Sequence, residues 1–178
     1  MRRVRRRTAI VIGSLVGTAV LVVLAGLPVY VFPAVDAPQH TDVVMVLGNS
    51  TPSRVALAER LVAEGYSDTL VISRFNQQRL PVCDEPQVFT VYCFTPDPFT
   101  TQGEARYLGE LAAAKGWSSA TVITFTPHIT RARLIVSRCF TGKLDMVADT
   151  TPLSIGYWAY QYLYQTGGFI KAALNPGC

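Results

Sequence analysis

An uninterrupted apolar stretch near the N-terminus is the strongest feature of the hydropathy pattern. Residues 8–32 contain no charged side chain, and the first charge after them is Asp36. At about 1.5 Å of rise per residue, a helix of this length measures about 37 Å, which exceeds the roughly 30 Å hydrocarbon core of a bilayer. The pattern predicts a transmembrane helix over residues 8–32, with Tyr30 and Phe32 at the far interface and Pro33 closing the span.

The charges before this stretch predict its orientation. Residues 1–7 contain five arginines, and basic residues resist transfer across a membrane. We therefore expect residues 1–7 to be a cytoplasmic tail and the chain after the helix to be extracytoplasmic. A cleaved signal peptide is the alternative, but its apolar region usually has about 7–15 residues, which favours an uncleaved anchor. No cysteine follows the stretch before Cys83, which argues against a lipoprotein.

Beyond a proline-containing stalk at residues 33–41, strand and helix patterns alternate. Continuous apolar runs at residues 42–48, 69–73 and 120–125 are typical of strands buried on both faces, and residues 144–147 resemble a shorter one. Apolar residues have the spacing of a helix in four segments. These run from Pro52 to a stop at Gly65, from Thr101 to Gly116, over residues 130–139, and over residues 153–174, with a weak point at residues 167–168. This order predicts one α/β domain over residues 42–178 with a mostly parallel sheet.

Residues 74–99 interrupt the alternation. They are rich in Pro, Gln and aromatic residues and contain two cysteines, which predicts a functional lid or a stapled loop. Four cysteines in an exported domain predict two disulfides, with three pairings open. Because Cys83 and Cys93 share this loop, we favour that pair, and Cys139 with Cys178 would then tie down the chain end. A zinc site is the alternative, although the spacings resemble neither a finger nor a ribbon.

Charge and motifs exclude several classes of function. The net charge of +4 comes from the tail: without its five arginines, eleven basic residues remain against twelve acidic ones, a net of −1. The domain is therefore not a basic nucleic-acid binder. A glycine-rich dinucleotide or nucleotide-triphosphate motif does not follow the first strand, so we expect no such cofactor and no metal.

The candidate site lies where the strands end. In open α/β sheets, ligands bind at the carboxyl ends of the strands, where helix N-termini add N–H donors. We expect the ligand to be bound by Asn49, Ser50, Arg54, Ser73, Thr101, Thr126 and Arg131, with His128 and Glu104 in catalysis. This set of arginines, hydroxyls and amides suits an anion such as phosphate or carboxylate.

Structural roles are the alternative for the same residues. Thr101 and Glu104 have the spacing of a capping box, and Asn49 and Ser50 are ordinary turn residues. A lone histidine is more often a hydrogen-bonded structural group than a catalyst. If His128 is catalytic and sits at a pocket rim, replacing it should abolish function and leave stability nearly unchanged.

At these same positions the chain resembles the YdcF-like family, which includes SanA and ElyC and is known as domain of unknown function 218. The matching pieces are residues 42–48, Arg54, residues 71–73, residues 101–105, residues 124–128 and residues 131–132. The resemblance implies a Rossmann-like three-layer fold, neighbouring first and third strands, and a role in envelope integrity and peptidoglycan synthesis.

The chain also departs from the family pattern. Family members commonly have Ser-Gly-Gly after the second strand, whereas Arg74 and Phe75 follow Ser73 here, and Glu104 stands where Asn is frequent. Set against the family it resembles, the chain has an insert with Cys83 and Cys93 that looks particular to an exported branch.

Together these features predict a membrane-anchored envelope protein with a pocket for an anionic, phosphate-containing ligand, for which a lipid-linked cell-wall intermediate is one candidate. If it is an enzyme, we expect hydrolysis or transfer at a phosphate ester. His128 would then be the acid or base, Arg54 and Arg131 the anion clamps, and Ser50 or Thr101 an orienting hydroxyl. The alternative is a non-catalytic scaffold that recruits envelope-synthesis proteins.

Overall fold

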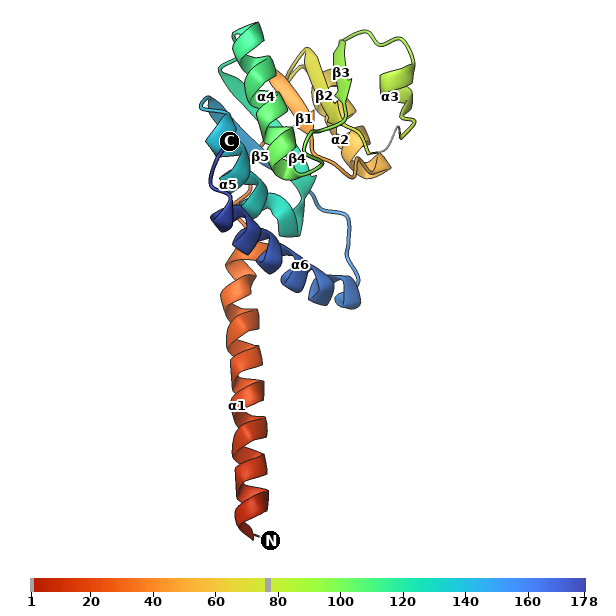
Figure 1. Cartoon of the computed structure of the whole chain (residues 1–178). Coiled ribbons are helices and arrows are strands. Elements are labelled where there is room, and N and C mark those ends of the chain that lie inside the picture. The colour runs from red at the N-terminus through yellow and green to blue at the C-terminus, as the bar shows by residue number, and fades with distance from the viewer. Residues whose placement is uncertain (1, 76–77) are drawn as a thin grey trace.

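A parallel sheet forms the centre of the domain in the computed structural model, which describes residues 2–75 and 78–178 (Figure 1). Within these residues the sheet has five strands in the order β3-β2-β1-β4-β5. The strands are β1 (Val43–Val46), β2 (Thr69–Ser73), β3 (Thr90–Phe94), β4 (Ser119–Phe125) and β5 (Lys143–Asp149). β1 lies between β2 and β4, and all its side chains are buried. The first strand and the strand predicted at residues 120–125 are therefore neighbours, as expected.

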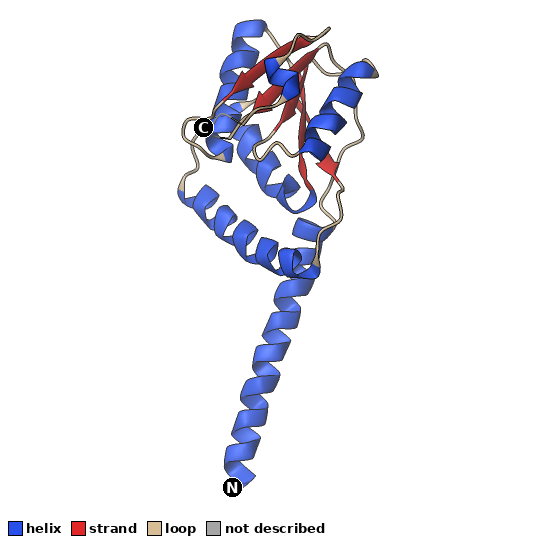
Figure 2. Ribbon diagram, turned by 90° about the vertical axis from the view of Figure 1, so that its right-hand side faces the viewer, coloured by secondary structure: helices blue, strands red, loops and turns tan. Residues whose placement is uncertain are grey.

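Helices cover both faces of the sheet, which gives the predicted α/β fold with three layers (Figure 2). On one face, α2 (Pro52–Ala63) packs its apolar side, including Ala58 and Leu61, against β1 and β2. On the other face lie α4 (Thr101–Lys115) and α5 (Ile129–Cys139), with Leu108 and Ile129 fully buried. Because both faces are covered, the strands read as continuous apolar runs.

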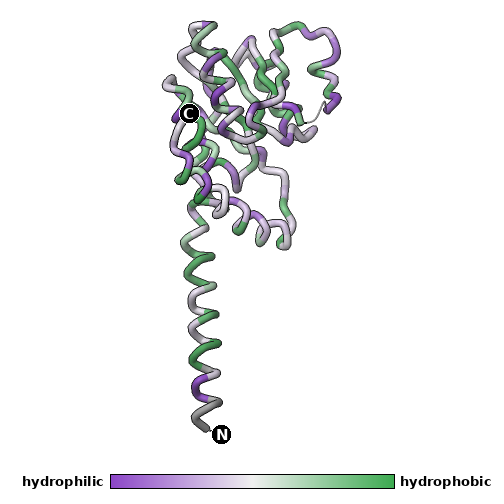
Figure 3. The backbone as a smooth tube through the Cα atoms, in the orientation of Figure 1, coloured by the Kyte–Doolittle hydropathy of each residue, from purple (hydrophilic) through white to green (hydrophobic). Residues whose placement is uncertain are grey.

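The N-terminal helix projects from the domain as a long rod (Figure 1). α1 (Arg2–Gly26) continues as a π-helical turn, η1 (Leu27–Val31), and the part from Arg6 to Val31 is long and apolar enough to cross a membrane (Figure 3). A signal sequence passes the same test of length and composition. The tail predicted at residues 1–7 belongs to α1 from residue 2 onward, and residue 1 lies outside the described residues.

The end of the N-terminal helix and the connection that follows it contact the domain. Tyr30 is buried, and its ring packs edge-on against Tyr162 with centroids 4.9 Å apart. Residues 33–41, which the sequence suggested as a stalk, are also held by the domain. The Asp36 backbone N–H donates to the Met146 carbonyl at 2.9 Å, and its carboxylate pairs with Arg133 at 2.7 Å. These contacts dock the connection on the domain and fix where the N-terminal helix leaves it.

The segment that interrupts the sequence pattern is more ordered than expected. It contains a one-turn helix, α3 (Pro81–Asp84), and the edge strand β3, which pairs with β2 from Thr69 opposite Thr90 to Ser73 opposite Phe94. An edge strand is covered less than a central one, and the β3 side chains are mostly half-buried. Residues 89–94 are nevertheless a run of aromatic, β-branched and apolar residues, a strand signal that was passed over because the segment around it is rich in Pro and Gln.

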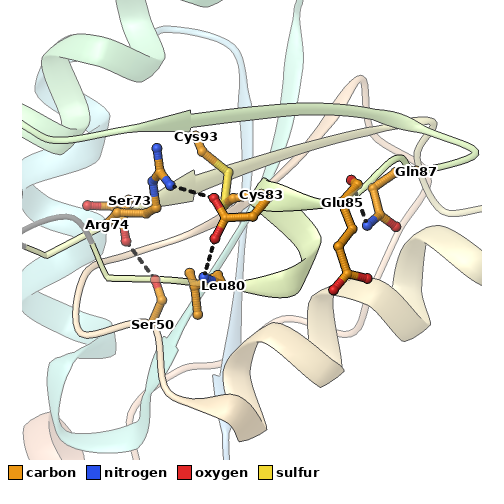
Figure 4. Close-up of a disulfide and its surroundings, with 9 residues drawn as sticks. Ser50, Ser73, Arg74, Leu80, Cys83, Glu85, Gln87 and Cys93 are labelled. Atoms are coloured by element: carbon orange, nitrogen blue, oxygen red, sulfur yellow. Dashed lines mark hydrogen bonds and ion pairs between the residues drawn. A yellow bond between two sulfur atoms is a disulfide. The ribbon is translucent and has the colours of Figure 1, made fainter.

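Both disulfides have the pairing that the sequence favoured. Cys83 of α3 is joined to Cys93 of β3, with Cα atoms 6.0 Å apart (Figure 4). Cys139 is joined to Cys178, with Cα atoms 4.9 Å apart. Asp84 adds to the first link, because its carboxylate accepts from the Leu80 N–H and pairs with Arg74 at 3.3 Å. The disulfide and this carboxylate hold α3 against the sheet edge.

Replacing Cys83 and Cys93 together with serine is expected to lower the free energy of unfolding by roughly 2–3 kcal/mol, because the link closes a loop of about ten residues in the unfolded chain. Replacing Cys139 and Cys178 is expected to cost more, roughly 4 kcal/mol, because that loop is longer. Urea unfolding of both double variants measures this. Equal unfolding midpoints for wild type and the Cys83/Cys93 variant would contradict the prediction.

Candidate functional site

A cavity of about 420 Å³ lies between the carboxyl edge of the sheet and the C-terminal helix α6 (Ile155–Leu174). α6 is continuous through residues 167–168, where the sequence suggested a weak point. The lining residues come from the ends of β1, β2 and β4, from the starts of α2, α4 and α5, and from α6. They are Gly48, Asn49, Arg54, Phe75, Pro96, Phe99, Thr100, Thr101, Glu104, Phe125, His128, Arg131, Tyr157, Tyr160, Gln161, Tyr164 and Gln165.

Glu104 joins α4 to the end of β1. Its carboxylate accepts a hydrogen bond from the Gly48 N–H, and the side chain is buried. Burial raises the pKa of Glu104, while hydrogen bonds and the charges of Arg131 and Arg54 act in the opposite direction. A raised pKa makes a carboxyl group more able to keep a proton, which it can then donate to a ligand in the adjacent cavity.

The capping box expected at Thr101 and Glu104 was wrong by one residue. The N-cap of α4 is Thr100, whose hydroxyl accepts from the Gly103 N–H at 3.4 Å. The Glu104 side chain does not bond back to the N-cap, because its carboxylate accepts a hydrogen bond from the Gly48 N–H instead. Thr101, released from capping, points its hydroxyl to His128.

The Glu104 carboxylate lies so close to the backbone at residue 48 that only glycine fits there. A Cβ atom at this position would lie 2.7 Å from Glu104 Oε1 and 3.0 Å from the Phe75 ring. We expect Gly48→Ala to lower the free energy of unfolding by roughly 1–3 kcal/mol, because the new methyl group overpacks a buried polar contact. Chemical unfolding measures the loss, and Gly156→Ala, at an exposed helical position with open space for a Cβ, is the matched control that should keep the stability of wild type or exceed it. Unchanged stability of Gly48→Ala would contradict the geometry.

His128 lies at the turn between β4 and α5 and is held on both ring nitrogens. Nδ1 is 2.9 Å from the Thr124 hydroxyl, and Nε2 is 3.4 Å from the Thr101 hydroxyl. Burial lowers the pKa of His128 well below 6.5, and the positive charges of Arg131 and Arg54 lower it further. The imidazole is therefore neutral near pH 7, with one nitrogen that donates a hydrogen bond and one that accepts.

Arg54 lines the cavity but is largely occupied by the protein. Nη1 donates to the carbonyls of Asn49 at 2.9 Å and Gly48 at 3.3 Å, and Nε lies 3.8 Å from Asp149 Oδ2. Its guanidinium also stacks over Phe125 at 4.7 Å, and burial lowers its pKa. Arg54 thus organises the loop after β1 and adds positive potential to the cavity.

Arg131 is the more available cation. Its Nε donates to Gln165 Oε1 at 2.7 Å, and among the described residues no group accepts a hydrogen bond from its terminal nitrogens. Gln165 is itself held, because its amide nitrogen donates to Gln161 Oε1 at 2.9 Å. Burial lowers the pKa of Arg131, yet the group remains charged at neutral pH. The pair of glutamines on α6 therefore orients one guanidinium at the cavity.

Some predicted site residues lie elsewhere. Ser50 and Ser73 are both buried, the Ser50 hydroxyl donates to the Ser73 carbonyl at 2.7 Å, and neither residue is among those that line the cavity (Figure 4). The Thr126 hydroxyl points to the Asp149 carbonyl at 3.5 Å and is also outside it. Asn49 does line the cavity, and its φ of 52° places it in the left-handed region that Asn tolerates well.

Sequence reasoning missed the wall that α6 contributes. Tyr157, Tyr160 and Tyr164 face the cavity on one side, and Phe75 packs against Phe99 on another, with ring centroids 4.0 Å apart. The sequence did contain a signal for this wall. Gln161 and Gln165 are four residues apart in a mostly apolar helix, so they share one side of it. Sites of this kind combine an apolar wall with a few polar groups.

Among the described residues, no cluster of His, Cys, Asp and Glu has the arrangement of a metal site. No family model, curated protein or solved structure matches the chain.

Proposed function

We propose that the chain is a single-pass membrane protein whose extracytoplasmic domain binds a phosphate-containing anion in the cavity between the sheet and α6. The proposal rests on the state of Arg131. Gln165 fixes its guanidinium through Nε, and no described residue accepts a hydrogen bond from its two terminal nitrogens. Arginine held in this way presents paired donors that fit the oxygens of phosphate.

The surroundings of Arg131 support an anion with an organic part. α4 and α5 begin at the cavity, so their first N–H groups and the positive ends of their dipoles face it. Thr101 adds a hydroxyl. The tyrosines of α6 and the Phe75–Phe99 pair provide an apolar wall, which suits a lipid-linked or otherwise organic phosphate better than the free ion.

Hydrolysis or transfer at a phosphate ester is the reaction that fits this arrangement. The neutral His128, with Nε2 toward Thr101, serves as the general base for a water or alcohol nucleophile. Glu104, with its raised pKa, is the candidate proton donor to the leaving oxygen. Arg131 and the helix N-termini neutralise the charge that develops on the phosphoryl oxygens.

The resemblance to YdcF-like proteins adds the biological setting of this proposal, a role in cell-envelope and peptidoglycan biogenesis. A non-catalytic scaffold that recruits envelope-synthesis proteins is the second candidate. It is favoured by the exposed apolar side chains of α6, which include Ile155, Leu163 and Leu174.

A titration of the detergent-solubilised full chain tests the binding proposal. The probes are inorganic phosphate, a polyisoprenyl phosphate and the matching polyisoprenol without phosphate. We expect saturable binding of the polyisoprenyl phosphate, weaker binding of phosphate and none of the alcohol. Equal binding of the phosphate ester and the alcohol would show that an apolar surface, and not the arginine site, is responsible.

The proposed topology gives a separate prediction. The arginines of residues 2–7 should hold the N-terminus in the cytoplasm and export the domain, where its two disulfides form. A reporter enzyme that is active only outside the cytoplasm, fused after Cys178, should be active. Activity of a reporter that works only in the cytoplasm would contradict this orientation.

A further inference from the structure

The outer side of α6 is a stripe of exposed apolar residues. Ile155, Leu163 and Leu174 are 90%, 78% and 77% exposed, and Ile170 is exposed as well. At 3.6 residues per turn, positions 155, 163, 170 and 174 fall on one side of the helix. We call these four residues the outer stripe of α6. Thr166 is the polar side chain of α6 on this side, and its hydroxyl is engaged by Tyr30 Oη and by the Tyr162 carbonyl.

The opposite side of α6, which faces the domain, is polar at its centre. Gln161 and Gln165 are 2% and 0% exposed and are satisfied by one another and by Arg131. Helices on the surface of a water-soluble domain have the reverse pattern, with apolar residues inward and polar residues outward. The inverted pattern indicates that the outer side of α6 faces a medium less polar than water.

The middle of α6 contacts the end of the N-terminal apolar helix. Tyr162 Oη donates to the Val23 carbonyl at 3.1 Å, and Tyr30 Oη lies 2.9 Å from the Thr166 hydroxyl. Gly26 permits this approach, because a Cβ there would lie 2.2 Å from the Tyr162 ring. α6 therefore crosses directly over the end of α1, transverse to it (Figure 1).

We propose that α6 lies in the plane of the membrane, in the interface on the domain side of the bilayer that α1 spans, with its outer stripe buried among lipid chains. The composition of α6 suits this position: Lys171 is its one charged residue, and Trp158 and five tyrosine and phenylalanine residues fit an interfacial helix. This inference rests on the proposed anchoring by α1.

The position of α6 bears on the ligand. α6 forms both the membrane-facing stripe and, through Tyr160 and Tyr164, a wall of the cavity. The cavity then opens at the level of the lipid headgroups, so a phosphate carried by a membrane lipid reaches Arg131 without leaving the bilayer.

Quenching of tryptophan fluorescence by brominated lipids tests the proposal on the full chain. Trp117→Phe and Trp158→Phe together remove the native tryptophans. Into this background we place one reporter at a time: Leu21→Trp in α1, Ile155→Trp on the outer stripe, or Val88→Trp. Val88 is fully exposed and precedes β3, at the amino edge of the sheet, which is the edge opposite to α6. Ile155 is seven residues before Tyr162, about 10 Å along the helix from the anchor contact.

The proteins are reconstituted in vesicles of phosphatidylcholine and phosphatidylglycerol with chain-brominated phosphatidylcholine. Leu21→Trp and Ile155→Trp should lose most of their emission, and Val88→Trp should keep it. All three positions are exposed, so the fold is expected to persist, and intact disulfides and circular dichroism confirm it.

Quenching of Leu21→Trp without quenching of Ile155→Trp would overturn the inference and leave the anchor intact. Red-shifted emission of Ile155→Trp would then place the stripe in water, and blue-shifted emission would place it against another protein. Loss of quenching at Leu21→Trp as well would overturn both the anchor and this inference.

Discussion

Replacing Arg131 with Gln is expected to weaken binding of a phosphate-bearing ligand roughly 10- to 100-fold, since hydrogen bonds to a charged group contribute about 1.5–3 kcal/mol. Arg131 lines the cavity, its Nε is held by Gln165, and no described group accepts from its terminal nitrogens, so its loss removes donors that are available to a ligand. Arg131→Lys should bind with intermediate affinity, because an ammonium keeps the charge but not the paired donors. Titration with a polyisoprenyl phosphate measures both variants.

A matched control separates this contact from general electrostatics. Arg60 is exposed on α2, away from the cavity, and Arg60→Gln removes the same charge. We expect Arg60→Gln to bind like wild type. If both variants lose affinity equally, the effect is one of overall charge, and Arg131 is not the clamp.

Replacing His128 with Ala is expected to abolish turnover or binding and also to lower the free energy of unfolding by roughly 2–4 kcal/mol. The sequence suggested a residue at a rim whose loss would leave stability nearly unchanged. The structure instead buries His128 to 6% exposure between the hydroxyls of Thr124 and Thr101. Its removal leaves a void and an unsatisfied buried hydroxyl at Thr124, and both effects destabilise the fold. A melting temperature equal to that of wild type would contradict this account.

The same residue predicts a dependence of stability on pH. The folded-state pKa of His128 lies well below 6.5, so near and below pH 6.5 the unfolded chain binds a proton that the folded chain does not. Stability should therefore fall as the pH falls from about 7 toward 5, by up to about 1.4 kcal/mol per pH unit.

His128→Gln isolates this effect. Glu104 works in the opposite direction, because its raised pKa favours the folded chain at low pH and that contribution is lost as the pH rises. The difference between wild type and His128→Gln cancels the Glu104 contribution, and urea unfolding at several pH values measures it. A difference that does not change with pH would contradict a neutral buried His128.

The central strands and their helices could be predicted because burial on both faces leaves a strong pattern. Val43–Val46 and Thr69–Ser73 are continuous apolar runs, and Gly116 ends α4 with a φ of 71°. β3 was missed although residues 89–94 are mostly aromatic and apolar, because the Pro- and Gln-rich segment around them suggested a loop. The docked connection at residues 33–41 was also hidden, since its hold depends on Asp36 meeting Arg133, 97 positions later in the chain.

The candidate site was partly predictable for a topological reason. The carboxyl ends of parallel strands share an edge, and this alone brings Asn49, Glu104 and His128 to one cavity. Topology does not give the direction of a side chain, so Ser50 was expected in the cavity although its hydroxyl turns to the Ser73 carbonyl. Nor does it reveal α6 as a wall, because the helix follows the last strand and could have packed elsewhere.

Native mass spectrometry of the detergent-extracted full chain tests the central claim, phosphate recognition by Arg131, most directly. The account predicts that wild type retains a phosphate-bearing lipid or lipid-linked species and that Arg131→Gln has lost it, while Arg60→Gln retains it. The same phosphate-bearing species in equal amount on wild type and Arg131→Gln, or its absence from wild type, would contradict the account.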